Sequence, residues 1–227
     1  MLLLHKFQCP ALTFANALLA AGIMPYICEL QIMKYDSPNS QSEILPNLLG
    51  LNSAEDIALS EFEGFLRAEI ELTEKLTNRT KLNIAYILKI HKLSLGHLYS
   101  FAGKYRDVNI SKTGFPFAAA RFLPETMQSF EVEILSQLKN RYSDKSQLVS
   151  DIAKVHGEFL FIHPFREGNG RAARILANLM SRKQGFGPLK FEMITDERFD
   201  EYVSAVQASA SKDYIKMEKL INSIFPD

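Results

Sequence analysis

Twelve consecutive residues, from His163 to Arg174, combine a base, a carboxylate, three residues that expose the backbone and a pair of arginines. His163 titrates near neutral pH and can take a proton from an incoming hydroxyl group. Glu167 offers a hard oxygen ligand for Mg²⁺, which usually binds through one or two carboxylates together with substrate phosphates and waters. Arg171 and Arg174 share one face of a helix and can fork onto phosphate oxygens. This inventory suits transfer of a nucleotide from a triphosphate.

Two helices are expected to position these groups, because largely apolar residues at helical spacing lie on both sides of the segment. They are Ile152, Val155, His156, Phe159 and Leu160 upstream and Ile175, Leu176, Leu179 and Met180 downstream. Pro164 disfavours helix at His163, and the glycines on either side of Asn169 allow a sharp turn with φ above zero. Backbone N–H groups at the start of the second helix can then face an anion. The segment is therefore predicted to be a phosphate-binding loop between two helices.

Each of these features also has an ordinary structural explanation. A histidine before proline is often a capping or core residue, Gly-Asn-Gly is often only a turn, and Arg-x-x-Arg is often a solvated helix face. The features occur together in one loop, and that coincidence favours the chemical interpretation.

The loop resembles, without a gap, the signature His-x-Phe-x-Asp/Glu-Gly-Asn-Gly-Arg-x-x-Arg of the Fic family. The matching residues are His163, Phe165, Glu167, Gly168, Asn169, Gly170, Arg171 and Arg174. A second segment, residues 101–117, is similar to the strand–turn–strand flap of that family and follows an expected helix that ends near Leu98. The resemblance runs from about Met33 to the C-terminus, with residues 83–182 as its centre. It implies an all-α Fic-fold helical bundle with a small β-hairpin flap over the active site.

The resemblance implies a protein adenylyltransferase. Such an enzyme transfers AMP from ATP to a Ser, Thr or Tyr hydroxyl of a target protein and releases pyrophosphate. By this resemblance, His163 is the general base and Glu167 is the metal ligand that holds Mg²⁺ between the α- and β-phosphates. Phe165 is expected to anchor the loop in the core.

Nucleotide contacts are expected mainly from the loop and from the helix that follows it. The amides of residues 168–170 are expected to cradle the phosphates and to stabilise charge that builds up in the transition state. Arg171 is expected near the reacting group and Arg174 at the outer phosphates. The full set of expected nucleotide-binding residues is Gly168, Asn169, Gly170, Arg171, Arg174, Lys112, Thr113 and Tyr202.

The flap segment has the pattern of a short hairpin. Val108 and Ile110 alternate with polar residues, a turn is expected at 113–114, and the alternation resumes at Phe115 and Phe117. An open edge of this hairpin could pair with an extended target segment and place its side chain above His163. The alternative is that residues 115–117 form a packed loop. The expected target-docking residues are Ile110, Gly114, Phe115 and Pro116.

Other reactions stay open at this point. Fic relatives that phosphorylate their target carry Lys at the position of Gly170, so glycine favours nucleotide transfer. Transfer of UMP or phosphocholine is also open, because the loop contacts phosphates and not the base, and base choice is expected in the helix around Tyr202. The second class is a nucleotide-binding Fic-like regulatory module without transfer. An intact His163 and Glu167 argue against it.

Composition is typical of a single helical domain without nucleic-acid binding. The chain has 227 residues, 47% of them hydrophobic, and equal numbers of basic and acidic residues, 26 each. Binding to a phosphate backbone needs an excess of Lys and Arg on one face, which this balance does not indicate. Further helical periodicity falls near 57–66, 84–91, 123–138 and 215–224. Three further histidines, His91, His97 and His156, lack ligand-like partners and are interpreted as structural or surface residues.

The first 32 residues differ from the rest. They contain both cysteines, Cys9 and Cys28, and an apolar stretch from Ala11 to Met24 that Asn16 interrupts. The stretch lacks a basic leader for a secretory signal and is too short and interrupted for a membrane span. We expect residues 1–32 to be an atypical extension upstream of a natural start at Met33, and residues 33–227 to be one Fic domain in a bacterial-type cytoplasm, away from membranes.

Regulation is expected from outside the loop. Many Fic proteins are restrained by a helix with the pattern Ser/Thr-x-x-x-Glu-Gly/Asn, whose glutamate binds the second motif arginine. Glu63 precedes glycine, but Leu59 occupies the hydroxyl position and Ser60 is one position away. Glu63 is a possible inhibitory residue, with a solvated helix carboxylate as the simpler interpretation. A separate small antitoxin partner, as in toxin–antitoxin pairs, is the other expectation.

Overall fold

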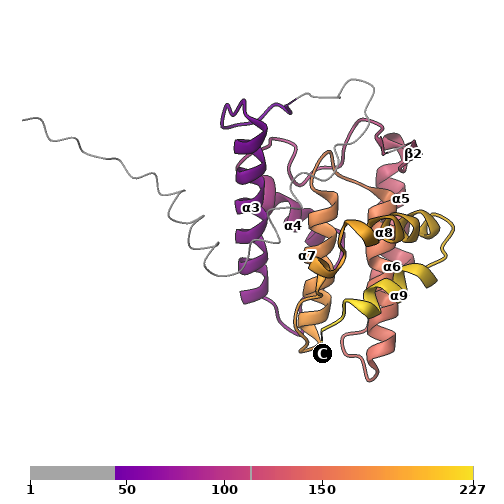
Figure 1. Ribbon diagram of the computed structural model, residues 1–227. Coiled ribbons are helices and arrows are strands. Elements are labelled where there is room, and N and C mark those ends of the chain that lie inside the picture. Colours follow the sequence, from indigo (N-terminus) through magenta and orange to yellow (C-terminus); the bar gives the residue numbers. More distant parts are fainter. Residues whose placement is uncertain (1–43, 113, 227) are drawn as a thin grey trace, which may run out of the picture. The chain divides into compact units, whose positions relative to one another are not determined.

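The computed structural model describes residues 44–112 and 114–226, and within them the chain is mainly helical (Figure 1). The α-helices are α3 (Ala54–Glu74), α4 (Ile84–Leu95), α5 (Leu123–Glu133), α6 (Lys145–Ile162), α7 (Asn169–Lys183), α8 (Asp196–Ser209) and α9 (Ile215–Ser223). Short 3₁₀ helices cover Ala120–Phe122, Leu135–Gln137 and Phe191–Met193. Two strands, β1 (Ser111–Lys112) and β2 (Phe115–Pro116), pair antiparallel. The predicted all-α bundle with one small hairpin is confirmed.

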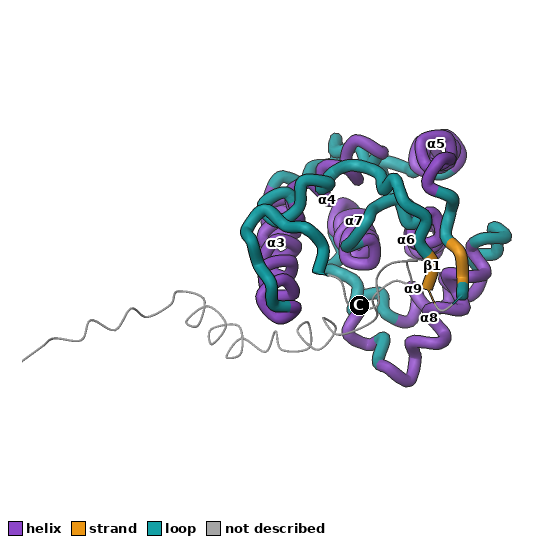
Figure 2. Tube along the Cα trace, turned by 90° about the horizontal axis from the view of Figure 1, so that it is seen from above, coloured by secondary structure: helices purple, strands orange, loops and turns teal. Residues whose placement is uncertain are grey.

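Helix α7 lies at the centre of the bundle. It packs against α3, α4 and α6, and α6 packs on its other sides against α8 and α9. Figure 2 shows α7 end-on, with α3 and α4 to one side of it and α6 to the other. The loop between α6 and α7 is therefore held by helices from both halves of the described chain.

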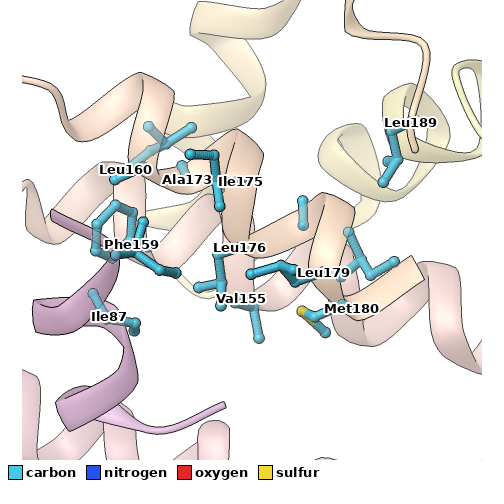
Figure 3. Close-up of a cluster of buried hydrophobic side chains, with 14 of the residues drawn as sticks. Ile87, Val155, Phe159, Leu160, Ala173, Ile175, Leu176, Leu179, Met180 and Leu189 are labelled. Atoms are coloured by element: carbon cyan, nitrogen blue, oxygen red, sulfur yellow. The ribbon is translucent and has the colours of Figure 1, made fainter. Parts of the chain in front are cut away.

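The core fills the space between α4, α6 and α7 (Figure 3). Ile87 from α4, Val155 and Phe159 from α6, and Leu176 and Leu179 from α7 belong to one core cluster, and all five side chains are fully buried. Those on α6 and α7 recur at helical spacing, so each helix turns one apolar face to the other. The pattern that predicted two helices around the motif thus also forms the surface that packs them together.

Side chains define where several helices begin. Ser53, Asn83 and Asp144 each accept a backbone N–H from the first turn of α3, α4 and α6. Such caps contribute about 1 kcal/mol each. Helix α7 begins differently, because its N-cap residue is Gly168, which has no side chain to cap the first N–H groups. Its N-terminus is therefore open to an external anion.

Two expected elements are shorter than predicted. Helix α5 ends at Glu133, because Ile134 leaves helical geometry at φ −123° and ψ −62°, and a 3₁₀ turn follows it. The hairpin strands have two residues each, and Val108 and Ile110 precede them. The Val108 carbonyl instead accepts a bond from the Arg106 side chain, so it is not available to a longer ladder.

Some expectations fall outside the described residues. These are the predicted extension 1–32, its cysteines and apolar stretch, and Thr113 in the flap. Within residues 44–112 and 114–226, no helix combines the length and apolar character that crossing a membrane requires.

Candidate active site

His163 ends helix α6 in a left-handed conformation, φ 53° and ψ 58°, which is uncommon for a residue other than glycine. Its N–H still donates to the Phe159 carbonyl at 2.9 Å. Its ring Nδ1 lies 2.8 Å from the Leu160 carbonyl. A carbonyl only accepts, so Nδ1 carries the proton and the Nε2 lone pair is the basic one. The sharp turn thus fixes both the direction and the tautomer of the ring.

The His163 ring is 5% exposed and lies beneath the flap. Phe117 stacks on it with 3.9 Å between ring centroids and 19° between planes. Burial lowers the pKa of His163 to about 3, and the positive charges of Arg106 and Lys112 act in the same direction. His163 is therefore neutral at physiological pH, which is the state a general base requires.

Phe165 and Asn169 hold the loop in shape. The Asn169 side chain accepts the Phe165 N–H and donates to the Phe165 carbonyl, both at 2.8 Å. The Phe165 ring is fully buried and stacks on His91 at 3.8 Å. The expectation that Phe165 anchors the loop is confirmed, whereas the Asn169 side chain adds a clamp that the sequence pattern did not indicate.

Gly168 and Gly170 meet different requirements. Gly168 has φ +77°, and a Cβ built on it would lie 2.8 Å from Phe65 Cζ and 3.0 Å from Leu95 Cδ1. Gly170 lies in the first turn of α7, and an added Cβ would find nothing within 4 Å. Gly168 is thus needed for the turn and for close packing, whereas the surface at Gly170 is open. An open surface beside a helix N-terminus suits a phosphate chain.

Arg171 binds a carboxylate from helix α3. Its Nη2 lies 2.6 Å from Glu61 Oε2 and 3.5 Å from Glu167 Oε1. Glu61, 8% exposed, also accepts the Tyr99 hydroxyl at 2.7 Å. The Arg171 guanidinium lies over the Phe65 ring, 4.6 Å from its centroid. Burial raises the pKa of Glu167, and the neighbouring Glu61 charge raises it further, against the pull of Arg171.

Sequence reasoning missed Glu61 and considered Glu63 instead. Glu63 is partly exposed two residues further along α3. A signal for Glu61 exists, because the buried face of α3 repeats at Glu61, Phe65, Ala68 and Leu72. An acidic residue in register with a core face needs a partner, and here that partner is a motif arginine.

Arg174 and Tyr202 are linked through Phe191 and His156. The Arg174 guanidinium lies 5.5 Å from the Phe191 ring centroid, and Phe191 stacks on buried His156. His156 Nε2 shares a hydrogen bond with the Tyr202 hydroxyl at 2.7 Å. Tyr202 is 8% exposed on α8, so its expected contact with a nucleotide base stays a prediction.

The structure brings the flap beside this loop and buries part of it. Ile110 is buried, while Gly114 and Pro116 are exposed and Phe115 lies 6.3 Å from the Phe161 ring. Burial lowers the pKa of Lys112, and the Glu167 carboxylate opposes that shift. Lys112 Nζ lies 5.8 Å from the ring centroid of Phe199 on α8, and Ile110 faces the core. His91 and His156 are confirmed as structural residues, both fully buried, and His97 bonds to Ser60 at 3.1 Å.

Comparisons with known proteins agree with this geometry. A model of the Fic/DOC family matches residues 81–181. The chain is 28% identical over 138 residues to the protein adenylyltransferase Fic of Nematostella vectensis, covering 60% of this chain and 31% of that protein. It is 28% identical over 162 residues to the protein adenylyltransferase VbhT of Bartonella schoenbuchensis, covering 67% and 33%. The chain thus spans about a third of the length of these curated relatives.

Solved Fic domains share the fold. The N-terminal Fic domain of the Bep8 effector from Bartonella sp. 1-1C aligns with a TM-score of 0.67 at 21% identity, covering 84% of this chain and 94% of that one. The BepC effector of Bartonella tribocorum, solved with bound AMPPNP, aligns with a TM-score of 0.67 at 18% identity, covering 85% and 97%. With the loop geometry above, these matches show that the chain has the Fic fold and that its residues 81–181 match the Fic/DOC family.

Proposed function

We propose that this chain transfers AMP from ATP to a Ser, Thr or Tyr hydroxyl of a target protein and releases pyrophosphate. The observation that carries the proposal is the neutral, tautomer-fixed His163 at the end of α6, beside the uncapped N-terminus of α7. The curated relatives that match the chain are protein adenylyltransferases, which supports the same reaction.

In the proposed reaction, His163 Nε2 accepts the proton of the target hydroxyl as its oxygen attacks the α-phosphorus. The bond between the α-phosphorus and the oxygen that leads to the β-phosphate breaks, and pyrophosphate leaves with that electron pair. Negative charge grows on the phosphate oxygens, where the α7 amides, Arg171 and Arg174 would stabilise it. Little else is needed, because catalysis of this kind depends mainly on position and charge.

Mg²⁺ fits the donor set of this site. Glu167 supplies one carboxylate beside the α7 N-terminus, and Mg²⁺ commonly takes one or two carboxylates together with phosphate oxygens and waters. Glu167 would hold the ion, which would neutralise charge on the triphosphate.

Target docking is proposed at the flap. Gly114 and Pro116 are exposed at the hairpin, next to the Phe117 ring that covers His163. An extended target segment could pair with this edge through main-chain hydrogen bonds. Phe115 would contact the segment, whereas Ile110 would support the flap from within the core.

Restraint of the activity is proposed at α3. The carboxylate that binds a motif arginine there is Glu61, and Glu63 is the alternative that the sequence pattern raised. A small antitoxin partner, a cytoplasmic location and a domain that begins at Met33 stay predictions.

The direct test is incubation of the purified chain with ATP and Mg²⁺, followed by intact-mass analysis beside His163→Ala. We expect an AMP-sized mass gain on the chain or on an added target only when His163 is present. UTP in place of ATP tests UMP transfer. ATP binding without any mass gain in the presence of candidate targets would favour a regulatory module that binds nucleotide, and absence of ATP binding would contradict both.

A further inference from the structure

Arg106 ties the two ends of the flap together. Its side chain is 4% exposed and lies ahead of the hairpin. Nη1 donates to the Val108 carbonyl at 2.7 Å, and Nη2 donates to the Ala118 carbonyl. Val108 and Ala118 bracket strands β1 and β2, so one guanidinium closes the base of the hairpin.

The same guanidinium also binds the catalytic turn. Nε donates to the His163 carbonyl at 2.8 Å, and Nη2 reaches the Ile162 carbonyl at 3.4 Å. The Arg106 N–H donates to the Pro164 carbonyl at 2.9 Å. These carbonyls follow the last intrahelical bonds of α6 and lie at the negative end of its dipole. Arg106 therefore caps α6 at the very residue that carries the base.

The chemistry of these contacts requires arginine. Among the described residues Arg106 makes no ion pair with a carboxylate, so its buried charge is compensated by backbone carbonyls. Burial and the nearby Arg166 lower the pKa of Arg106 to about 10, so it stays protonated at neutral pH. A planar fork with five donors can reach several carbonyls at once, whereas an ammonium group cannot.

We propose that Arg106 is a positioning residue that fixes the flap and the His163 base relative to each other. Without its bonds, the hairpin base and the His163 turn can separate, and the stacking of Phe117 on the His163 ring loosens. The consequence for transfer rests on the proposed function, but the coupling itself is a property of the fold and can be measured without it.

The test is a histidine side-chain NMR spectrum of the full chain, with the His163 signals assigned from His163→Ala. A stacked aromatic ring shifts the protons of its neighbour, so Phe117→Leu calibrates how far the His163 signals move when the ring is lost. The variants are Arg106→Gln and Arg106→Lys, and the matched control is Arg121→Gln, an exposed arginine in the 3₁₀ helix after the flap.

We expect both Arg106 variants to show more than half of the shift that Phe117→Leu produces, while the signals of His91 and His156 stay in place. Arg121→Gln should match the wild type. Folded Arg106 variants with unchanged His163 signals would overturn the proposal. Equal movement of all buried histidines would also overturn it, because it would mean a general loosening of the core. If Arg106→Gln does not fold, Arg106→Lys decides.

A second measurement is the rate of AMP transfer in the assay with ATP and Mg²⁺. Arg106→Lys should lower the rate of AMP transfer by about 100-fold, the effect of roughly 1 Å of misplacement, and leave ATP affinity within about two-fold, because the α7 N-terminus is untouched. If the wild type transfers nothing, the proposed function fails and the NMR result still decides the coupling. Transfer at the wild-type rate in a folded Arg106→Lys variant would count against the proposal.

Discussion

At the scale of single residues, the site is built from groups whose charge states are set by burial. His163 is kept neutral, and Glu167 is driven toward its protonated form by burial and by the Glu61 charge, against the pull of Arg171. Glu61 takes part of the Arg171 charge, since it competes with Glu167 for the same Arg171 nitrogen. The balance among the charges of Glu61, Glu167 and Arg171 therefore sets how much positive charge Arg171 can offer to a bound triphosphate.

The pKa of His163 predicts a flat pH profile. With a pKa of about 3, the His163 base is already deprotonated at every pH above about 5. An enzyme whose base is an ordinary histidine instead loses activity as the pH falls through about 6.5, because the ring becomes protonated. The rate of AMP transfer should therefore stay constant from about pH 5.5 to pH 8 at saturating ATP and Mg²⁺. Initial rates across that range test this. A fall centred near pH 6.5 would show that the ring titrates normally.

Replacement of Glu61 should affect nucleotide binding. Glu61→Gln removes a negative charge 2.6 Å from Arg171, so more of the Arg171 charge becomes available to phosphates. We expect ATP to bind several-fold more tightly and the free energy of unfolding to fall by about 1–3 kcal/mol. Glu63→Gly is the comparison and should leave ATP affinity and activity unchanged. Calorimetric titration of both variants measures this.

Opposite results for the two glutamate variants would assign different roles to Glu61 and Glu63. Weaker ATP binding by Glu61→Gln would show that Glu61 orients Arg171 toward the phosphates. Strong activation by Glu63→Gly would assign the restraint to Glu63.

At the scale of elements, the shape of the loop depends on the junction at the start of α7. Gly168 joins the loop to the helix in a left-handed conformation, and a Cβ at this position would collide with Phe65 of α3 and Leu95 of α4. The loop thus depends on helices that lie far from it in the sequence.

A matched pair of glycine variants tests this junction. Gly168→Ala should lower the free energy of unfolding by about 1–3 kcal/mol, because it adds backbone strain and a Cβ at 2.8 Å from Phe65. Gly170→Ala should be neutral or stabilising by up to about 1 kcal/mol, because alanine favours helix and its Cβ meets open space. Urea unfolding of both variants gives the comparison. Equal effects at the two positions would contradict the packing argument.

At the scale of the whole molecule, three buried histidines in the described part of the chain link stability to pH. Burial lowers the pKa to about 4 for His91 and about 3 for His156 and His163, from 6.5 in the unfolded chain. A depressed pKa contributes stability that is complete above the unfolded value and is lost as pH falls toward the folded value. The free energy of unfolding should therefore be level above about pH 6.5 and fall between about pH 6.5 and pH 3.

Each such histidine can contribute on the order of 3 kcal/mol to that fall. Urea unfolding at a series of pH values measures the slope. His156→Gln keeps a hydrogen-bonding side chain beside Tyr202 but cannot titrate, so it should flatten the curve. An unchanged slope in that variant would mean that His156 titrates normally.

The motif and its surroundings were largely predictable from local sequence. Helical spacing on both sides of the loop, Pro164 after His163 and the two glycines act over a few residues, and local geometry follows from such short-range constraints. The two helices, the turn, the buried Phe165 and the open helix start were all expected from these residues and are present. The Fic fold itself was expected from the resemblance that the same motif carries, and it is confirmed.

Only the tertiary structure decided which distant groups reach the loop. Glu61 and Arg171 are 110 residues apart, and Arg106 and His163 are 57 residues apart. Periodicity marks which face of a helix is buried, but it does not say which buried polar groups meet, because that depends on how the helices cross and how closely they pack. The sequence thus determined the chemistry at the loop, and packing around α7 decided its charge balance and its link to the flap.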